Sequence, residues 1–279
     1  MTSLTDLFLR KGADRRLRGG HLWVYSNEVD SDRSPLPGFA AGDPVAVRSA
    51  DGRLLGSAYM EPNALICARV YAPRRECAPD AALFAGALRQ ALSLRQRFFQ
   101  QPFYRLVYGD SDLLPGLVID RFGDTLVMQL NNAGIERYEP ALVAALVDLL
   151  QPAGVLLRAD SRARREQNLE DRVEVVYGEV PEVVALEENG VRFEAPVHGG
   201  QKTGWFYDHR LSRARLQQLV AGCDVLDVYS YIGGWGVQAA VAGAATVCCI
   251  DSSEAALELS LIHISEPTRQ LASSRMPSS

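Results

Sequence analysis

The sequence predicts a multi-domain α/β chain, α+β in overall organisation, with a small β-barrel, a central β-β-α-β-β domain and a closing βαβ unit. Three observations lead to this prediction. Short strands separated by turn signals fill about the first 70 residues. Further strands surround one amphipathic helix between residues 104 and 196. An apolar strand, a glycine-rich turn, a helix and a second strand then follow one another from residue 224 to residue 251.

The first domain is expected to be all β. Pro35, Pro37 and Gly38 mark a loop, and Asp51-Gly52 is a hairpin signal. The close spacing of the strands favours a barrel over a sandwich. The expected strands cover residues 4–9, 21–25, 43–48, 54–59 and 66–71.

The N-terminal segment is locally basic. Residues 1–24 carry five basic side chains against two acidic ones, a local charge of +3, although the net charge of the whole chain is −5. Phosphate binding relies on Lys and Arg, so the net charge argues against a broad nucleic-acid surface. The local cluster fits a solvated face or an RNA contact equally well. Trp23 is interpreted as a core residue in preference to a base-stacking platform. The RNA-contact candidates are Lys11, Arg15, Arg16, Arg18 and Trp23.

An amphipathic helix over residues 80–99, with Asp80 as its cap, is expected to link the first two domains. The charged side of this helix, which includes Arg89, Arg95 and Arg97, is expected to face solvent. In the central domain the expected helix covers residues 139–150. The expected strands there cover residues 104–108, 117–120, 125–130, 154–158 and 173–176.

Two polar clusters in the central domain are interpreted as structural. Asp110 and Asp112 lie beside Gly and Pro and are read as turn formers in preference to a metal site. Three arginines in a polar loop are interpreted as surface charge in preference to an RNA-facing patch. They are Arg162, Arg164 and Arg165.

Asn189-Gly190 predicts a tight hairpin between strands at residues 183–186 and 191–195. The next run, residues 198–210, is dense in glycine, polar and aromatic side chains, a mixture that suits the mouth of a ligand site better than a core. A helix over residues 211–219 then leads into the βαβ unit.

The βαβ unit carries the strongest signal. Val225, Leu226 and Val228 predict a short buried strand, and three glycines after it are expected to let the backbone turn tightly against a ligand. A helix begins at residue 237, and a second strand over residues 246–250 ends in Asp251. Such units bind nucleotide-like ligands at the carboxyl edge of the sheet.

The ligand is predicted from two departures from a nicotinamide site. The glycine spacing is not G-x-G-x-x-G, and Asp227 stands where a pyrophosphate would be repelled. A ligand with a cationic centre fits better, which favours S-adenosylmethionine (SAM), with Asp251 available to bridge its ribose hydroxyls. Another nucleotide, or a βαβ turn without a ligand, remains the alternative.

Composition limits where the protein is expected to occur and which kinds of site it is expected to contain. No apolar run is long enough to span a membrane, and no secretory signal pattern is present at the N-terminus, so the default expectation is a cytoplasmic protein. The five cysteines form no C-x-x-C pair, which supports neither a zinc site nor a disulfide framework. No metal is expected.

The chain resembles a known family at residues 200–206 (GQKTGWF), at Asp208 and Arg210, and at residues 227–236 (DVYSYIGGWG). It is similar to the class I SAM-dependent methyltransferases that modify cytosine C5 in large-subunit ribosomal RNA. The similarity runs from about residue 4 to residue 258. It implies a PUA-type RNA-binding domain around residues 21–26 and a Rossmann-like catalytic domain. The cofactor site it implies comprises Asp227, Tyr229, Ser230, Gly233, Gly234, Gly236, Asp251, Thr203, Phe206 and Arg210.

Methylation of cytosine C5 requires a cysteine thiolate that adds to C6, and a base that removes the C5 proton. In the family these groups follow the second strand of the catalytic domain. Cys248 and Cys249 lie in an apolar strand and are interpreted as packing residues, and Cys223 lies at the edge opposite the glycine turn. No catalytic residue is therefore assigned in this chain.

After residue 258 the sequence departs from the family. Residues 259–269 resemble a translated sequencing adaptor, so we expect a fragment of a longer enzyme, inactive by itself, with residues 197 onward partly disordered; a divergent natural C-terminus is the alternative. The expected parts are an RNA-binding domain (1–75), a linker helix (76–103), a central domain (104–196), a partial methyltransferase domain (197–258) and a tail (259–279). The rival interpretations are a non-catalytic RNA-binding module and a methyltransferase with another target.

Overall fold

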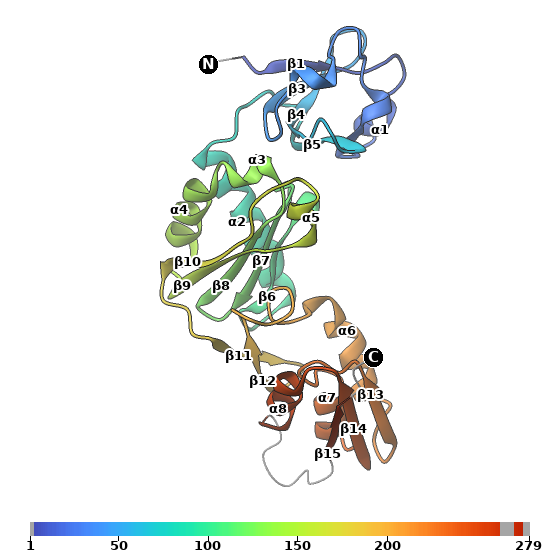
Figure 1. Cartoon of the computed structure of the whole chain (residues 1–279), viewed down its shortest axis with the longest axis vertical. Coiled ribbons are helices and arrows are strands. Elements are labelled where there is room, and N and C mark those ends of the chain that lie inside the picture. The colour runs from blue at the N-terminus through green and yellow to red at the C-terminus, as the bar shows by residue number, and fades with distance from the viewer. Residues whose placement is uncertain (1–2, 263–270, 276–279) are drawn as a thin grey trace. The chain divides into compact units, whose positions relative to one another are not determined.

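The computed structural model describes residues 3–262 and 271–275, with side chains for residues 3–260. The chain forms two compact units, residues 1–100 with 105–180 and residues 101–104 with 181–279 (Figure 1). The expected boundary at residue 196 placed the 183–196 hairpin in the central domain, whereas the structure groups this hairpin with the second unit. Each unit is described by itself.

The first unit begins with a five-stranded sheet in the order β1-β3-β4-β5-β2, in which only the β1–β3 pairing is parallel. A bridge between Leu9 and Val29, just beyond β1 and β2, links the two ends of the sheet, as expected for a small barrel. The core contains Leu7, Val24 and Val47. The strands and the short helix are β1 (Thr5–Phe8), α1 (Arg15–Arg18), β2 (Trp23–Tyr25), β3 (Pro44–Arg48), β4 (Leu54–Met60) and β5 (Ile66–Pro73).

Trp23 is not a core residue, contrary to our interpretation. Successive side chains of a strand point to opposite faces, and in β2 it is Val24 that points inward and is fully buried. The half-buried Trp23 ring instead contacts the His21 ring edge-on at 5.4 Å, and the Arg69 guanidinium lies over it at 5.3 Å. The indole therefore presents one partly open face.

The rest of the first unit is a second five-stranded sheet in the order β10-β9-β8-β7-β6. The parallel β8–β9 pair is connected through α4, which packs beside α2. The Asp80 carboxylate accepts a hydrogen bond from the Leu83 amide, so the predicted cap of α2 is confirmed. The elements are α2 (Ala81–Phe98), β6 (Phe103–Tyr108), β7 (Leu117–Phe122), β8 (Thr125–Leu130), α3 (Ala133–Glu136), α4 (Glu139–Leu150), β9 (Gly154–Ala159), α5 (Arg162–Arg165) and β10 (Arg172–Gly178).

On the charged side of α2, Arg89 and Arg97 are exposed as predicted, whereas Arg95 is not simply solvated. Arg95 donates to both Asp112 carboxylate oxygens at 2.7 Å and to the Arg105 carbonyl oxygen. Asp112 also accepts from the Tyr108 amide, so it is both a turn former and an ion-pair partner. This bidentate pair, with both side chains largely buried, fastens the helix to the turn between β6 and β7.

Arg164 also differs from the expectation of surface charge. It is fully buried and donates to the Leu130 carbonyl oxygen, the Glu136 carboxylate and the Glu170 carbonyl oxygen. Its neighbours Arg162 and Arg165 are exposed, as predicted. A four-residue helix, α5, turns one of the three arginines inward and leaves the other two in solvent.

Glu61, directly after β4, is a buried carboxyl group of the first unit. Burial raises its pKa to about 7, and the charge of Arg69 lowers the pKa by less. The Gln167 amide lies 3.0 Å from both carboxylate oxygens. The folded protein therefore holds a proton here that an unfolded chain would release near pH 4.5.

We expect this proton to make the first unit less stable at higher pH. Between pH 5 and pH 8 the native state binds more protons at Glu61 than the unfolded state does, so the free energy of unfolding falls, by roughly 1–3 kcal/mol. Glu61→Gln should remove that slope, which denaturant unfolding at the two pH values would measure. Glu166→Gln, at an exposed carboxylate of the same cavity, is the matched control. A slope unchanged in Glu61→Gln would contradict the assignment.

The second unit starts with the predicted hairpin. Asn189 and Gly190 both have positive φ, as a type I′ turn requires. A parallel sheet in the order β13-β14-β15 follows, with α7 in the β13–β14 crossover. The elements are β11 (Val183–Glu188), β12 (Val191–Pro196), α6 (Arg210–Gln217), β13 (Asp224–Val228), α7 (Gly236–Val241), β14 (Thr246–Asp251), α8 (Glu254–Ile262) and β15 (Leu271–Arg275).

Two expectations about this unit are corrected. β13 is not buried: Leu226 and Val228 are 62% and 44% exposed, because β13 is an edge strand and one of its faces is open. Residues 197–262 form regular elements around a core of their own, which includes Val247, Cys249 and Leu257, rather than a partly disordered segment.

Parts of the expected tail, residues 259–279, belong to the fold of the second unit. α8 continues through residue 258 to Ile262, and residues 271–275 pair with β14. Residues 263–270 and 276–279, where the remainder of the adaptor-like tail falls, lie outside the described residues. Among the described residues no helix is both long and apolar enough to cross a membrane.

Candidate functional site

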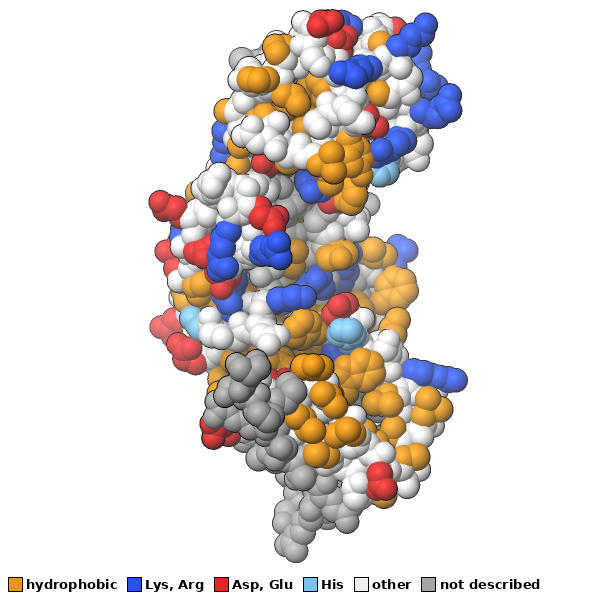
Figure 2. Space-filling model, turned by 45° about the vertical axis from the view of Figure 1, so that its right-hand side comes forward, with side chains coloured by type: hydrophobic (Ala, Val, Ile, Leu, Met, Phe, Trp, Pro, Cys, Tyr) orange, Lys and Arg blue, Asp and Glu red, His pale blue; other side chains and the backbone are white. Residues whose placement is uncertain are grey.

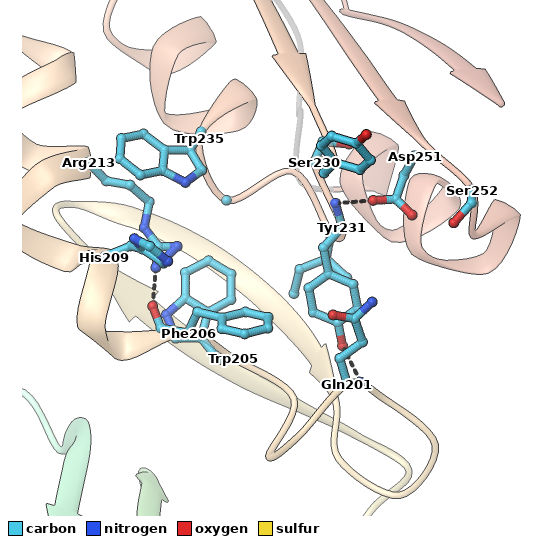
Figure 3. A pocket seen from close by; sticks show the side chains of 13 residues that line it. Gln201, Trp205, Phe206, His209, Arg213, Ser230, Tyr231, Trp235, Asp251 and Ser252 are labelled. Carbon is cyan, nitrogen blue, oxygen red and sulfur yellow. Dashed lines mark hydrogen bonds between the residues drawn. The ribbon is translucent and has the colours of Figure 1, made fainter. Parts of the chain in front are cut away.

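The best candidate for a ligand site is a pocket of about 380 Å³ in the second unit, at the carboxyl ends of β13 and β14 (Figure 3). This volume lies within the range of roughly 300–1,000 Å³ that is usual for small-molecule sites. Five of the predicted cofactor residues line it, namely Phe206, Tyr229, Ser230, Gly234 and Asp251. The other lining residues are Gln201, Trp205, His209, Arg213, Tyr231, Ile232, Trp235 and Ser252.

Each of the three glycines in the turn is required for a different structural reason. Gly233 has φ +76°, which side chains disfavour. A Cβ on Gly236 would lie 2.4 Å from the Cys249 sulfur, so this glycine lets α7 approach β14. A Cβ on Gly234 would lie 2.7 Å from Arg213 Nη1 and 3.1 Å from Trp205 Cη2. Gly234 lines the pocket, but what requires a glycine there is packing beneath the turn.

Asp251 lies at the end of β14 and faces the pocket (Figure 3). One carboxylate oxygen accepts from the Tyr231 amide at 2.8 Å, and the other accepts from the Ser253 amide at 2.9 Å. Tyr231 and Tyr229 both have positive φ, so this part of the loop is held in a conformation that non-glycine residues adopt rarely. Asp251 thus fixes the loop and keeps lone pairs that can accept from a ligand.

Asp227 lies beneath the loop instead of lining the pocket. Its carboxylate accepts from the Gly236 amide at 2.9 Å. Burial raises the pKa of Asp227, while the Gly236 hydrogen bond and the Arg213 charge lower it by less. A cationic ligand group nearby would favour the ionised form.

Thr203 and Arg210 do not line the pocket. Thr203 is fully buried. The Arg210 side chain pairs with Glu188 and donates to the Phe103 carbonyl oxygen. Arg210 therefore contacts Glu188 and the backbone instead of the pocket, and Thr203 is buried outside the pocket lining.

Sequence reasoning missed Arg213, His209 and Tyr231 among the lining residues. Tyr231 lies inside the glycine-rich run that carried the resemblance, so it could have been included. His209 lies in the 198–210 run that was assigned to the mouth of a ligand site, so it could also have been included. Arg213 gave no such signal, because the helix over residues 211–219 was interpreted only as amphipathic. The side chain of Arg213 is 3% exposed, and its guanidinium lies 4.5 Å from the centre of the Trp205 ring.

Of the two cysteines interpreted as packing residues, Cys249 is buried and Cys248 is half-buried. All five are free. Burial raises the pKa of Cys249 and of Cys67 to about 12, which disfavours the thiolate that a nucleophile needs. None of the five lines the pocket. Within the described residues no cluster of three or more His, Cys, Asp or Glu side chains could hold a metal ion.

The predicted RNA-contact residues lie on the N-terminal barrel. Lys11, Arg15, Arg16 and Arg18 are exposed. Two of these side chains have partners: Arg16 pairs with Glu28 and lies over the Tyr25 ring, and Arg18 pairs with Asp14. Figure 2 shows Lys and Arg side chains over this part of the chain.

Models of known protein families match the N-terminal part of the chain and the part that contains the pocket. Residues 7–73 match the model of PUA-like domains. The second match contains the pocket. Residues 147–261 match the S-adenosylmethionine-dependent methyltransferases. The methyltransferase match thus reaches back from the pocket into β9 and β10 of the first unit.

Curated relatives are similar over most of this chain. Ribosomal RNA large subunit methyltransferase I of Tolumonas auensis is 35% identical over 260 residues, which are 91% of this chain and 65% of the relative. The protein of the same name from Vibrio cholerae is 36% identical over 257 residues, 90% of this chain and 64% of the relative. The chain thus spans slightly less than two thirds of the length of these methyltransferases.

Solved structures support the fold. A candidate SAM-dependent methyltransferase from Streptococcus mutans has a TM-score of 0.80 at 23% identity, covering 97% of this chain and 71% of that one. A structure described as a candidate methyltransferase complexed with SAH has a TM-score of 0.81, again at 23% identity, covering 97% of this chain and 70% of that one.

The predicted fold class is confirmed: the chain has a PUA-like N-terminal domain and a Rossmann-like methyltransferase fold. The prediction of SAM as cofactor agrees with the matched methyltransferase model. The comparisons do not bear on cytosine C5 as the methylated position. They lend no support to the expectation of an inactive fragment.

Proposed function

We propose that this protein takes part in SAM-dependent methylation of large-subunit ribosomal RNA, and that the methylated atom is C5 of a cytosine. The observation that carries the proposal is the pocket that joins the glycine turn after β13 to Asp251 at the end of β14. The proposal assigns RNA recognition to residues 1–75 and cofactor binding to residues 197–258, in a cytoplasmic protein. The names of the relatives supply the class of RNA.

The residues of the pocket fit SAM by their chemistry. Asp251 can accept from the ribose hydroxyls, and the rings of Phe206 and Trp235 offer apolar surface for an adenine. The pocket also has carboxylate charge close by, from Asp251 and from Asp227 beneath the loop, which suits a ligand with a sulfonium and an ammonium group. A nicotinamide dinucleotide, with its pyrophosphate, would meet these carboxylates unfavourably.

When bound, SAM supplies an electrophilic methyl group on its sulfonium. The residues of this chain bind and orient that group. Asp251 holds the Tyr231 amide, and therefore the loop, in place before the ligand arrives, which lowers the entropy lost on binding. The Tyr231 hydroxyl accepts from the backbone N–H of Gln201 and so connects this loop to the 198–210 run.

Cytosine C5 as the target rests on the resemblance of residues 200–206 and 227–236 to enzymes of that specificity. The chemistry needs a thiolate that adds to C6, and the buried, high-pKa thiols of Cys249 and Cys67 do not suit that role. The chain described here thus provides a cofactor site, and the proposal locates the nucleophile outside the described pocket.

Isothermal titration calorimetry of the full chain with SAM tests the cofactor site. Saturable binding is expected, and its absence would refute the proposal. Methyl transfer is then tested with isotopically labelled SAM and large-subunit ribosomal RNA, followed by nucleoside mass spectrometry. Methyl label on a guanine instead of a 5-methylcytidine would overturn the proposed target.

The basic face of the barrel provides a separate test of RNA binding. Replacing Lys11, Arg15 and Arg18 together with Gln should weaken binding of a ribosomal RNA fragment uniformly across sequences. It should also flatten the dependence of log K on log salt by about two to three units, as expected for lost phosphate contacts. Replacing three other exposed arginines, Arg75, Arg89 and Arg97, together with Gln removes the same charge and is the matched control. If the two triple variants show the same dependence of log K on log salt, the barrel residues do not contact RNA phosphates.

A further inference from the structure

Glu188, the last residue of β11, is a buried carboxylate for which the proposed reaction has no direct use. Its side chain is fully inaccessible to solvent. An ionised carboxylate is costly to bury unless charges and hydrogen bonds compensate it. Its partners therefore indicate what holds it there.

Four side chains converge on this carboxylate. Arg213 Nε lies 2.9 Å from Oε1, and the Gln238 amide donates to the same oxygen at 3.1 Å. Trp205 Nε1 donates to Oε2 at 3.0 Å, and Arg210 Nε donates to it at 3.3 Å. The partners come from α6, α7 and the loop before them, so Glu188 connects the hairpin to three other segments of the second unit.

Two of these partners form a wall of the pocket. Arg213 and Trp205 both line it, as Figure 3 shows. The Arg213 guanidinium lies 4.5 Å from the centre of the Trp205 ring and 5.9 Å from that of Trp235, and it donates to the Phe206 carbonyl oxygen. The Arg213–Trp205 pair is thus held from below by Glu188 and from the side by Phe206.

The glycine turn lies directly on this pair. A Cβ on Gly234 would come within 2.7 Å of Arg213 Nη1 and 3.1 Å of Trp205 Cη2, so a side chain at this position would collide with the pair. Arg213 and Trp205 therefore support the Gly234 end of the loop from below, while Asp251 holds the Tyr231 end. The position of Arg213 and Trp205 is in turn set by Glu188.

The charge of Glu188 matters as well as its shape. Burial lowers the pKa of Arg213, and Glu188 is the foremost group that opposes this, ahead of Asp208 and Asp227, while the like charge of Arg210 adds to the lowering. Without the carboxylate charge, two guanidinium groups would face each other across a neutral side chain. We therefore expect the Arg213 side chain to move away from its place beneath the loop.

We propose that Glu188 is a positioning residue of the SAM site: its buried carboxylate holds Arg213 and Trp205 beneath the glycine turn. It acts through these two side chains and does not line the pocket. This inference rests on the proposed function for the identity of the ligand. The contacts of Glu188 with Arg213 and Trp205 do not depend on the identity of the ligand.

Glu188→Gln, which keeps the shape and removes the charge, tests the inference in the full chain. SAM affinity measured by calorimetry should fall about tenfold. Glu187→Gln, on the same strand and the opposite face, should leave the affinity unchanged. Val220→Ala removes part of the core of the same unit, so it reports how much affinity is lost through destabilisation alone. Equal losses in Glu188→Gln and Val220→Ala would overturn the positioning role.

A readout without ligand separates this inference from the proposed function. With 5-fluorotryptophan in place of the three tryptophans, fluorine NMR should show a displaced Trp205 resonance in Glu188→Gln, because its indole N–H has lost a charged acceptor. Trp205→Phe assigns the resonance. An unchanged resonance would overturn the positioning role of Glu188. Failure of the unsubstituted chain to bind SAM would refute only the proposed function.

Discussion

Asp251→Ala is expected to weaken SAM binding about a hundredfold, which corresponds to roughly 2.7 kcal/mol. The substitution removes the acceptor of the Tyr231 and Ser253 amides and the carboxylate proposed to bind the ribose. Hydrogen bonds to a charged group contribute about 1.5–3 kcal/mol each, so the loss of one such ligand bond accounts for most of the effect. Calorimetric titration of the full chain with SAM would measure it.

Asp224→Ala is the matched control for this experiment. Asp224 is an exposed aspartate at the opposite end of the same strand pair, where it accepts from the Thr246 hydroxyl. It should leave SAM affinity within about twofold of that of the unsubstituted chain. If both alanine variants bind SAM equally well, Asp251 has no part in the cofactor site.

Arg164→Met should destabilise the first unit by about 3–5 kcal/mol. The side chain is buried, and its loss leaves the Glu136 carboxylate and two backbone carbonyl groups without their donor. Removing one partner of a buried ion pair has a cost of this size. Thermal unfolding followed by circular dichroism would show the transition of this unit at a lower temperature.

Arg162→Ala and Arg165→Ala are the controls, because they remove the same charge from the same short helix. Their side chains are 91% and 63% exposed, and exposed ion pairs contribute about 0–1 kcal/mol. Both variants should unfold within a degree or two of the unsubstituted chain. If all three variants lower the unfolding temperature by a similar amount, the contacts of Arg164 do not stabilise this unit more than an exposed arginine does.

Much of the fold could be predicted because its signals are local. The Asn189-Gly190 turn, the Asp80 cap and the glycine turn after β13 depend on a few neighbouring residues, and each lies where the sequence predicts it. The order of strands and helices in the central domain follows from apolar periodicity in the same way. Short helices such as α1 and α5 were missed, since four residues carry too little periodicity.

The candidate site was predicted in part. Tyr229, Ser230 and Asp251 line the pocket because the loop and the end of β14 form one edge of a parallel sheet, which is a general property of such sheets. Arg210 and Thr203, which the resemblance also implied, do not line the pocket. Which of the implied residues reach the pocket depends on how distant segments of the chain pack together, and no local pattern specifies that packing.

Local sequence signals were sufficient for the longer strands and helices, the glycine turn and the acid at the end of the next strand, because these depend on neighbours along the chain. Which charges are buried became clear from the three-dimensional arrangement alone. Arg164 meets Leu130 and Glu136, and Glu188 meets Arg213 and Gln238, across separations of 25 to 50 residues. Burial of a charge depends on partners brought together from distant segments, and no local pattern in the sequence specifies them.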